Sequence, residues 1–481
     1  MVTEGESKKL IVISVPFART ARYMISSALF SRLKVEYDVL LVGPLFASES
    51  VRAQFSGDRV RFWAFDQTAD RMPWLYRRIF IATEMLRRYG HWFRFRKLGL
   101  AYYWDCLTRQ TIAGAGTAVG RIRRWLLYRG LGVLGYFRST WSIVEAMCGA
   151  RLFDTSPFES IISGYDTVAV VHAANWGDQE RYLGYCARQL SLESVLVPYT
   201  TDQLMINGHL ISPKAWICPQ GPVEARYAVD YHGVSPDRVI PLGMVWRRNL
   251  ERLEAEGLTT GRGGARGPGR TILYAGLIAG WFPRASELLA VRALVDAVRE
   301  KRLPAATVIY RPVITDDADK ESLLKLFSEE PLVTLQWPQA ALIGMDQSVS
   351  TSIREEVLEY LAQLRVADVF VMSATTTMMF DALHFGIPCV ANFTDPTGAL
   401  RKNGFSSSYV VHDESLRSVP GMPIAHSLPD LVRHVREALE AEGRAGRAAY
   451  VGRQLFSAWD YPDHDYIDRF VDLIAHLQPR R

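Results

Sequence analysis

Short apolar runs alternate with amphipathic stretches along most of the chain. A run rich in β-branched residues predicts a strand buried on both faces, and apolar residues at helical spacing predict a helix that covers it. This alternation predicts an α/β protein with parallel sheets. The strands expected in the first half are 10–16, 37–42, 60–65, 159–163, 168–172, 194–198, 215–218 and 239–242. Those expected in the second half are 271–275, 307–310, 332–336, 369–372 and 388–391.

A stretch rich in Gly and Arg and poor in apolar residues separates the two series of strands, which predicts an interdomain linker. We therefore expect two Rossmann-like parallel-sheet domains that face a cleft, with ligand sites at the carboxyl ends of the strands. The expected boundaries are a first domain over 1–248 with a helical insertion over 71–150, a linker over 249–270, a second domain over 271–445 and a helical tail over 446–481.

The stretch over 367–393 reads as strand, hydroxyl-rich turn, helix and strand. A helix start leaves unpaired backbone N–H groups and carries the positive end of the helix dipole, so it suits a diphosphate. Hydroxyl groups at this turn would add hydrogen-bond donors, and Asp381, one turn into the helix, could reach a sugar hydroxyl. An ordinary capped helix is the alternative interpretation. The hydroxyl residues in question are Ser373, Thr375, Thr376 and Thr377.

Composition narrows the class of protein. Hydrophobic residues make up 48% and charged residues 22% of the chain, which are globular values. No uncharged apolar run reaches the length of about 18 residues that predicts a membrane-spanning helix. The apolar run after Lys8 and Lys9 is short and lacks a cleavage site, so it predicts a first strand and not a signal peptide. The five cysteines have no paired spacing and fit buried thiols in a reducing cytoplasm.

Positive charge is concentrated in the insertion. Between Arg71 and Arg138 there are fourteen Lys and Arg residues against two acids, Glu84 and Asp105. These basic residues are mixed with Trp, Tyr, Phe and Leu, a combination typical of peripheral contact with a membrane that bears anionic headgroups. Simple packing of the helices on the sheet is the alternative. Nucleic acid is a third possibility, but no nucleic-acid-binding motif supports it.

The first half offers candidate side chains at its predicted strand ends. No G-x-G-x-x-G follows the first strand, so the dinucleotide fingerprint is absent. A loop expected over 17–22 makes Arg19 and Arg22 candidate anion contacts on the acceptor side, unless the loop is simply solvated. The candidates for a general base are Asp202, His172 and Asp178. A turn-forming Asp202, a packed His172 and a helix-capping Asp178 are the structural alternatives.

Three stretches together resemble GT-B-fold bacterial surface-polysaccharide transferases and the related CDP-glycerol glycerophosphotransferases. They are ADVFVMSATTTMMFDALHFGIPCV, TTDQLMINGHLISPKAWICPQGPVEARYAVDYHGVSPDRVIPLG and VIYRP, within about residues 195–393. The resemblance implies that the second half binds the donor diphosphate. Where the family motif continues Arg-Pro-His-Pro, Val313 follows Arg311 and Pro312 here, so we keep Arg311 as a phosphate contact and assign no histidine. Motifs of the nucleotide-sugar 2-epimerases, which share the fold, are not visible.

The resemblance implies transfer of a sugar from a nucleotide-sugar donor to a lipid-linked or polysaccharide acceptor. Helix amides, threonine hydroxyls and Arg311 would stabilise the leaving phosphate without a metal or a cofactor. Gly276 and Gly280 would lie beside the donor, or simply form a βα turn. We interpret the acids of Asp317-Ala318-Asp319 and Asp463-His464-Asp465 as solvated.

The expected location is cytoplasmic, at the inner face of the membrane. Two alternatives stay open: a CDP-polyol phosphotransferase of the same fold, and a non-catalytic nucleotide-sugar-binding protein.

Overall fold

The computed structural model contains two compact units, which we describe separately. The first is built mainly from Met1–Asn249 and Ala458–Arg481, and the second from Leu250–Gln347 and Arg354–Ser457. The structure describes the chain except residues 1–8, 25–26, 67–71, 99–103, 105–115, 258–268, 278–281, 315, 338–352, 375, 399–418, 441–443, 462–464 and 478–481.

A six-stranded parallel sheet forms the centre of the first unit, with the order β3-β2-β1-β4-β5-β6. This order reverses direction between β1 and β4, as in a Rossmann domain. The strands are β1 (Lys9–Ser14), β2 (Asp38–Val42), β3 (Val60–Trp63), β4 (Asp166–His172), β5 (Glu193–Leu196) and β6 (Trp216–Ile217).

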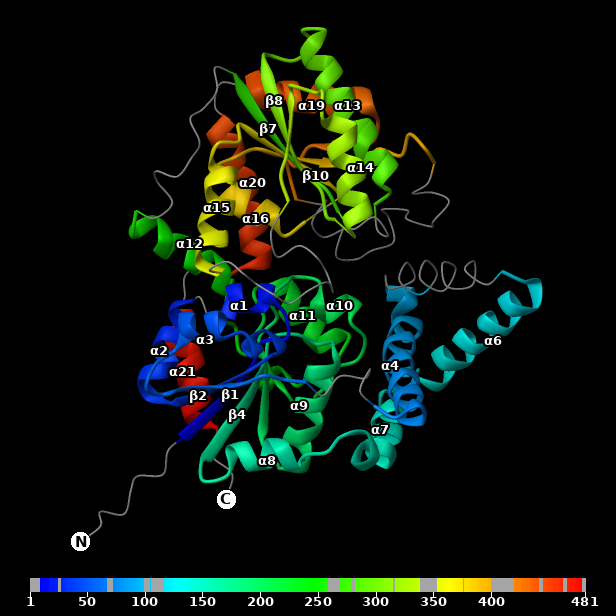
Figure 1. The fold of residues 1–481 in the computed structure, drawn as a ribbon, viewed down its shortest axis with the longest axis vertical. Coiled ribbons are helices and arrows are strands. Elements are labelled where there is room, and N and C mark those ends of the chain that lie inside the picture. Colours follow the sequence, from blue (N-terminus) through cyan, green and yellow to red (C-terminus); the bar gives the residue numbers. More distant parts are fainter. Residues whose placement is uncertain are drawn as a thin grey trace. The chain divides into compact units, whose positions relative to one another are not determined.

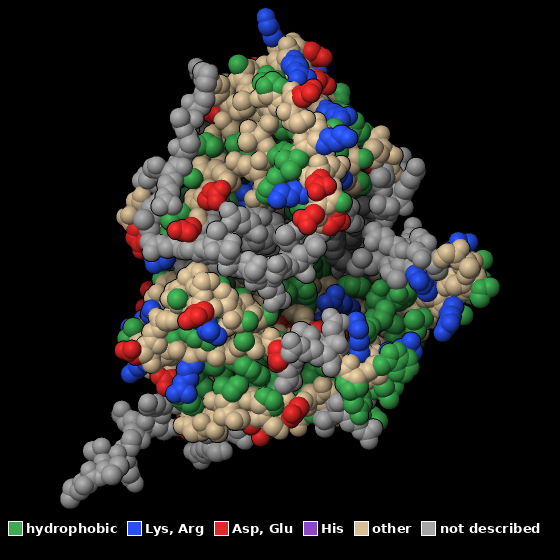
Figure 2. All heavy atoms as spheres, viewed as in Figure 1, with side chains coloured by type: hydrophobic (Ala, Val, Ile, Leu, Met, Phe, Trp, Pro, Cys, Tyr) green, Lys and Arg blue, Asp and Glu red, His purple; other side chains and the backbone are tan. Residues whose placement is uncertain are grey.

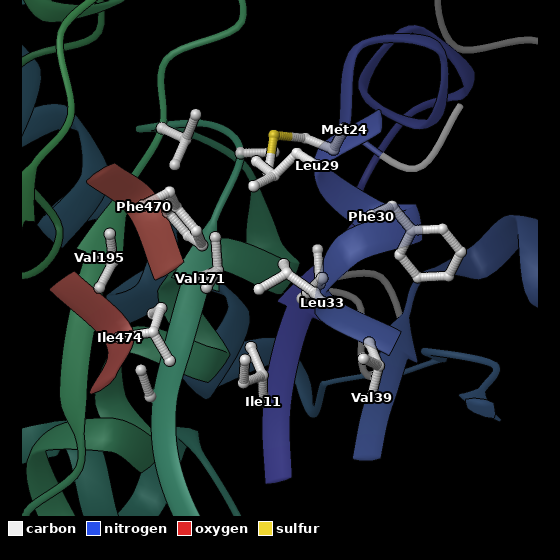
Figure 3. Close-up of a cluster of buried hydrophobic side chains, with 14 of the residues drawn as sticks. Ile11, Met24, Leu29, Phe30, Leu33, Val39, Val171, Val195, Phe470 and Ile474 are labelled. Atoms are coloured by element: carbon white, nitrogen blue, oxygen red, sulfur yellow. The ribbon is translucent and has the colours of Figure 1, made fainter. Parts of the chain in front are cut away.

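Alternate residues of each strand point to opposite faces of the sheet, and helices cover the apolar side chains on both faces. Ile11 and Val171 pack beneath α2 (Ala28–Glu36) and α21 (Tyr466–His476), as Figure 3 shows. Leu10 and Val12 contribute to a second cluster on the other face, with α8 (Ser156–Ile162) and α9 (Asp178–Gln189). The unit also contains α1 (Ala18–Met24), η1 (Pro44–Ala47), α3 (Glu49–Phe55), α10 (Gln203–Ile206), α11 (Pro222–Asp230) and η4 (Pro236–Arg238).

Three local predictions for this unit were wrong. Residues 159–162 belong to α8, because Phe158 and Ile162 are buried at a helical spacing of four, and Ser163 follows the helix. Residues 239–242 form no strand, and Val239 makes only one isolated bridge to Ile217. The loop expected over 17–22 is largely α1.

The second unit repeats the same architecture. Its six parallel strands have the order β12-β11-β10-β7-β8-β9, so the reversal falls between β7 and β10. The strands are β7 (Arg270–Ala275), β8 (Ala306–Arg311), β9 (Val333–Leu335), β10 (Val369–Ser373), β11 (Cys389–Asn392) and β12 (Ile424–Ala425). The helices are α13 (Arg284–Arg299), α14 (Asp317–Phe327), α15 (Ile353–Arg365), α16 (Met378–His384), α19 (Leu428–Glu440) and α20 (Arg444–Trp459).

The ends of the two halves differ from the expected boundaries. The expected linker begins inside α12 (Val245–Ala255), and the expected start of the tail falls inside α20. The last helix, α21, contributes Phe470 and Ile474 to the core of the first unit, where Figure 1 shows it beside α2. The expected tail is therefore divided, because Ala458–Arg481 belongs to the first unit and the preceding residues, up to Ser457, to the second.

The basic insertion of the first unit contains α4 (Trp74–Phe95), η3 (Arg96–Leu98), α6 (Ala118–Leu134) and α7 (Arg138–Leu152). Helix α4 contacts the body of the unit through Arg87 and Trp92, which donate to the carbonyl oxygens of His209 and Ile206, and α6 packs on α4 (Figure 1). Glycine allows this close crossing, because a Cβ atom at Gly90 would lie 2.1 Å from the carbonyl oxygen of Gly135. None of the described helices is long and apolar enough to cross a membrane.

We predict that Gly90→Ala destabilises the first unit by about 1–3 kcal/mol, because the added methyl group overlaps backbone that cannot rotate away. The matched control is Gly130→Ala in α6, where an added Cβ meets nothing within 4 Å. That control should be neutral or stabilising by up to about 1 kcal/mol, since alanine favours a helix over glycine. Urea unfolding of both variants measures the difference, and equal midpoints would contradict the close crossing.

Candidate functional sites at the carboxyl ends of the two sheets

In the first unit, the reversal of strand order lies between β1 and β4. Phe17 follows β1 and Trp176 follows β4, and their rings stack with centroids 4.5 Å apart. The buried amide of Gln179 donates from Nε2 to Ser14 Oγ at 2.7 Å and to the carbonyl oxygen of Val42 at 2.8 Å. These contacts fix the start of α9 against β1 and β2, so the loop between β4 and α9 has a defined course.

His172 lies at the carboxyl end of β4 and forms a buried pair with Glu180. Its Nδ1 atom is 2.6 Å from Glu180 Oε2, while Oε1 of the same carboxylate accepts the backbone N–H of Ala174 at 3.2 Å. A carboxylate on Nδ1 selects the tautomer with its proton there, which leaves Nε2 as an acceptor. Nε2 is buried and has no hydrogen-bond partner among the described residues. The structure thus pairs His172 with Glu180, which the sequence analysis did not single out, and the use of His172 as a general base stays a prediction.

The other candidate site residues of the first half lie in three different parts of the unit. Asp178 is the first residue of α9, following Gly177 at the cap position. Asp202 precedes α10 and accepts a hydrogen bond from Thr200 Oγ1 at 2.6 Å. This contact matches the turn-forming alternative. Arg19 and Arg22 lie in α1, and the positions of their side chains are outside what the structure describes.

A second buried carboxyl group, Glu224, lies near Asp202. Glu224 Oε2 accepts the backbone N–H of Gln220 at 2.7 Å, and Oε1 has no partner among the described residues. Burial raises the pKa of Glu224 to about 8, and the nearby Asp202 carboxylate adds to the rise. Glu224 is therefore largely protonated at neutral pH, which makes it a hydrogen-bond donor beside the turn that carries Asp202.

In the second unit, the hydroxyl-rich turn follows β10 as predicted, but the first three N–H groups of α16 are already used. Thr376 Oγ1 accepts the N–H of Met378 at 3.1 Å, and the carbonyl oxygens of Thr376 and Thr377 accept those of Met379 and Phe380. Ala374, just after the strand, has a φ of +55°, which is uncommon for a residue other than glycine. Thr376 and Thr377 are half-buried, and Thr375 lies outside the described residues.

Two further donor-site predictions need correction. Ser373 is fully buried, and its Oγ lies 2.9 Å from Tyr274 OH, so it belongs to the interior of the sheet. Asp381 is also buried and accepts a hydrogen bond from Tyr360 OH at 2.5 Å. Asp381 therefore holds α15 against α16 and does not present a carboxylate to a sugar.

Arg311, at the end of β8, lies beside the same tyrosine. Its guanidinium is 5.3 Å from the centre of the Tyr360 ring and donates to Gln363 Oε1 at 2.8 Å. The structure thus brings Arg311 and Asp381 together through Tyr360. Arg311 is half-buried, and its use as a phosphate contact stays a prediction.

A buried network around Glu287, which the sequence analysis missed, supports the first loop of the second unit. Glu287 Oε1 accepts the N–H of Leu277 at 2.6 Å, and Oε2 accepts from Tyr310 OH at 2.8 Å and from Arg284 at 2.7 Å. Burial raises the pKa of Glu287, while Arg284 opposes the rise. A Cβ atom at Gly276 would lie 2.7 Å from this carboxylate, so the absence of a side chain at Gly276 leaves room for Glu287. Gly280 lies outside the described residues.

The two D-x-D triplets have structural partners where they are described. Asp319 pairs with Arg284 at 2.9 Å, and Asp465 caps α21. The interpretation of Asp319 as a solvated acid was therefore wrong. Among the described residues, no group of three or more His, Cys, Asp or Glu side chains is arranged to hold a metal ion.

Three buried histidines, also missed, join the insertion to the loops of the first unit. His91 of α4 stacks on His232 with centroids 4.8 Å apart and lies 3.4 Å from His209 between their Nδ1 atoms. Burial and the two neighbouring imidazoles hold the pKa of His91 well below its usual value. Arg87 of the same helix donates to the carbonyl oxygens of His209 and Asn175. Helix α4 therefore contacts the loops that follow β4 and β5.

Two Rossmann-like units in one chain define the GT-B fold. No protein-family model and no curated protein matches the chain. The S. aureus MnaA–UDP co-structure matches with a TM-score of 0.53 and 11% identity, over 98% of this chain and 96% of that chain. The Methanocaldococcus jannaschii UDP-GlcNAc 2-epimerase, solved with UDP-GlcNAc and UDP, matches with a TM-score of 0.51 and 10% identity, over 98% and 99%. At such identities the likeness shows the fold alone.

We predict that Glu224→Gln changes how stability depends on pH. Above about pH 4.5 the unfolded chain loses this proton, whereas the folded chain keeps it up to about pH 8. Wild-type stability from this group therefore falls as pH rises through that window, by up to about 1.4 kcal/mol per pH unit. The variant lacks this slope and should gain on the wild type between pH 5 and pH 8. Denaturant unfolding at several pH values tests this, with the exposed Glu321→Gln as control, and parallel curves would refute it.

Proposed function

We propose that this protein is a glycosyltransferase that moves a sugar from a nucleotide-sugar donor to a hydroxyl of a lipid-linked or polysaccharide acceptor. The observation that carries the proposal is the His172–Glu180 pair at the strand reversal of the first sheet. A histidine whose Nδ1 is fixed by a carboxylate has its Nε2 lone pair available for a proton. The second unit, with its hydroxyl-rich turn at the corresponding reversal, takes the role of donor domain.

The acceptor step requires His172 Nε2, which is buried in this structure, to become accessible to the acceptor hydroxyl. The acceptor hydroxyl oxygen attacks the anomeric carbon of the donor sugar, and its proton passes to His172 Nε2. The bond from the anomeric carbon to the phosphate oxygen breaks, and the nucleotide leaves with the electron pair. Glu180 stabilises the imidazolium that forms. The stacked Phe17 and Trp176, both half-buried, offer a flat apolar surface for the face of an acceptor sugar ring.

The donor step requires the turn after β10 to rearrange its own hydrogen bonds. Thr376 Oγ1 occupies the N–H of Met378 in this structure. A phosphate oxygen that takes over this N–H frees the hydroxyl to donate as well, so binding would exchange one internal hydrogen bond for two charge-assisted ones. The neighbours of known structure that were solved with UDP or UDP-GlcNAc support a nucleotide-sugar as the ligand class.

Those neighbours also favour a second candidate, a nucleotide-sugar 2-epimerase, because the M. jannaschii structure bears that name. The products separate the candidates. A transferase releases nucleotide and glycosylates an acceptor, whereas an epimerase changes the sugar without an acceptor. A CDP-polyol phosphotransferase releases CMP, and a non-catalytic binding protein turns over none of these donors.

We predict that a thermal-shift screen of UDP-, GDP-, CDP- and CMP-linked donors identifies one that stabilises the protein. Thr376→Val should then weaken binding of the selected nucleotide by about 10- to 100-fold, because it removes a hydrogen bond to a charged group. Thr307→Val is the control, since Thr307 is an exposed threonine on β8 of the same unit. If both variants bound the nucleotide with equal affinity, the donor phosphates would not contact the turn that carries Thr376.

We predict that His172→Ala lowers kcat by about 10²–10⁴-fold with little change in donor affinity, as expected for loss of a general base. Glu180→Gln should also lower kcat and alter the pH–rate profile, because it removes the charge that stabilises the imidazolium and its one amide oxygen can accept from only one of His172 Nδ1 and the Ala174 N–H. His476→Asn, in the exposed last turn of α21, is the control. Full activity of His172→Ala in a transfer assay would exclude His172 as the base.

A further inference from the structure

The outward face of α6 is unusually apolar for a solvent-facing helix. Val119, Ile122, Leu126 and Val133 are 77%, 60%, 58% and 57% exposed, and their spacings of three, four and seven place them on one side of the helix. Fourteen of the eighteen exposed large hydrophobic side chains on described residues lie between Trp74 and Met147, which localises this surface to the insertion. Figure 2 shows hydrophobic side chains gathered where α6 approaches α7, with arginines along α6.

The opposite side of α6 already has its packing partner. Tyr128 is buried and stacks on Tyr89 of α4 with centroids 4.8 Å apart. A Cβ atom at Gly132 would lie 2.4 Å from the Trp104 ring, so α6 sits against that side chain through a glycine. Core packing therefore accounts for Tyr128 and Gly132 and leaves the Val119–Val133 side facing out.

Charge identifies the kind of partner. Residues 117–144 contain five arginines and no acid. The described acids of the insertion, Glu84 and Glu145, are paired with arginines inside the unit and do not offset that charge. Arg129 lies over the ring of Trp125 at 5.6 Å. An aliphatic stripe flanked by arginine and tryptophan matches the region between acyl chains and anionic headgroups, where arginine reaches outward and aliphatic side chains enter.

We infer that the Val119–Val133 face of α6 docks on an anionic lipid bilayer, with the helix parallel to the membrane plane. The aliphatic residues enter the boundary of the acyl chains, and Arg123 and Arg129, which flank this face, contact lipid phosphates. A nucleic acid would meet Ile122, Leu126 and Val133 with phosphates, which leaves the centre of the face without a favourable contact. The inference stands without the donor chemistry. If the acceptor is lipid-linked, as the proposed function has it, α4 connects this face to the loops after β4 and β5.

Sedimentation of the full chain with vesicles tests the inference. The protein should bind vesicles that contain phosphatidylglycerol, bind vesicles of phosphatidylcholine alone weakly, and dissociate as salt is raised. The double variant Ile122→Asp/Leu126→Asp should lose binding by about tenfold or more. Arg123→Gln and Arg129→Gln should each lower binding by about fivefold. The control Leu324→Asp/Leu326→Asp changes two exposed leucines of α14 in the second unit and should bind as wild type does.

Circular dichroism and donor hydrolysis in solution should match wild type for all four variants, since each changes an exposed side chain outside the candidate sites. The inference would be overturned if vesicle binding were equal with and without anionic lipid and equal for wild type and the α6 variants. Binding to RNA or DNA, or self-association, that disappears in the Ile122→Asp/Leu126→Asp variant while vesicles are not bound would also overturn it. Binding to anionic vesicles by a protein that turns over no donor would sustain this inference and reject the proposed function.

Discussion

Glutamates in the first turns of helices hold the loops at the carboxyl ends of both sheets. Glu180 accepts the backbone N–H of Ala174, and Glu224 and Glu287 do the same for Gln220 and Leu277. In each case the helix that follows a strand reaches back to the loop that joins them, as in a capping box. All three side chains are fully buried, so loss of one would leave a buried N–H without an acceptor. The course of the loops, and hence any chemistry there, depends on this interaction.

The same carboxylates link fold to candidate chemistry. Glu180 uses one oxygen on the loop and the other on His172 Nδ1, so the orientation of the imidazole is tied to that of the backbone. Glu287 likewise joins the loop after β7 to Tyr310 and Arg284. Glu224 has a raised pKa and one carboxyl oxygen without a hydrogen-bond partner among the described residues. It therefore makes fewer hydrogen bonds within the fold than Glu180 and Glu287 do. Unused hydrogen-bonding capacity in a buried group calls for a ligand, a water or a functional role.

Elements that depend on local pattern were predictable, and contacts between distant segments were not. The β10–turn–α16 unit follows from a buried apolar run, hydroxyl residues and a glycine stop, all contiguous in sequence. The same pattern did not show that Ser373 faces Tyr274 or that Asp381 meets Tyr360, since those partners lie 99 and 21 residues away. Helix α8 was mistaken for a strand because a seven-residue helix carries only two buried residues, too few to establish a period. A glutamate at the third helical position after a strand would have pointed to Glu180 and Glu224.

Helix α4 relates the insertion to the first sheet. Toward the body, Arg87 and His91 contact the loops after β4 and β5, and a Cβ atom at Gly208 would lie 2.8 Å from the backbone of Arg88. Toward α6, the backbone of Gly90 touches that of Gly135. Backbone contacts of this kind cannot be relieved by a change of rotamer, so α6 cannot tilt without moving α4. Helix α4 thus contacts both α6 and the loop between β4 and α9, which follows His172.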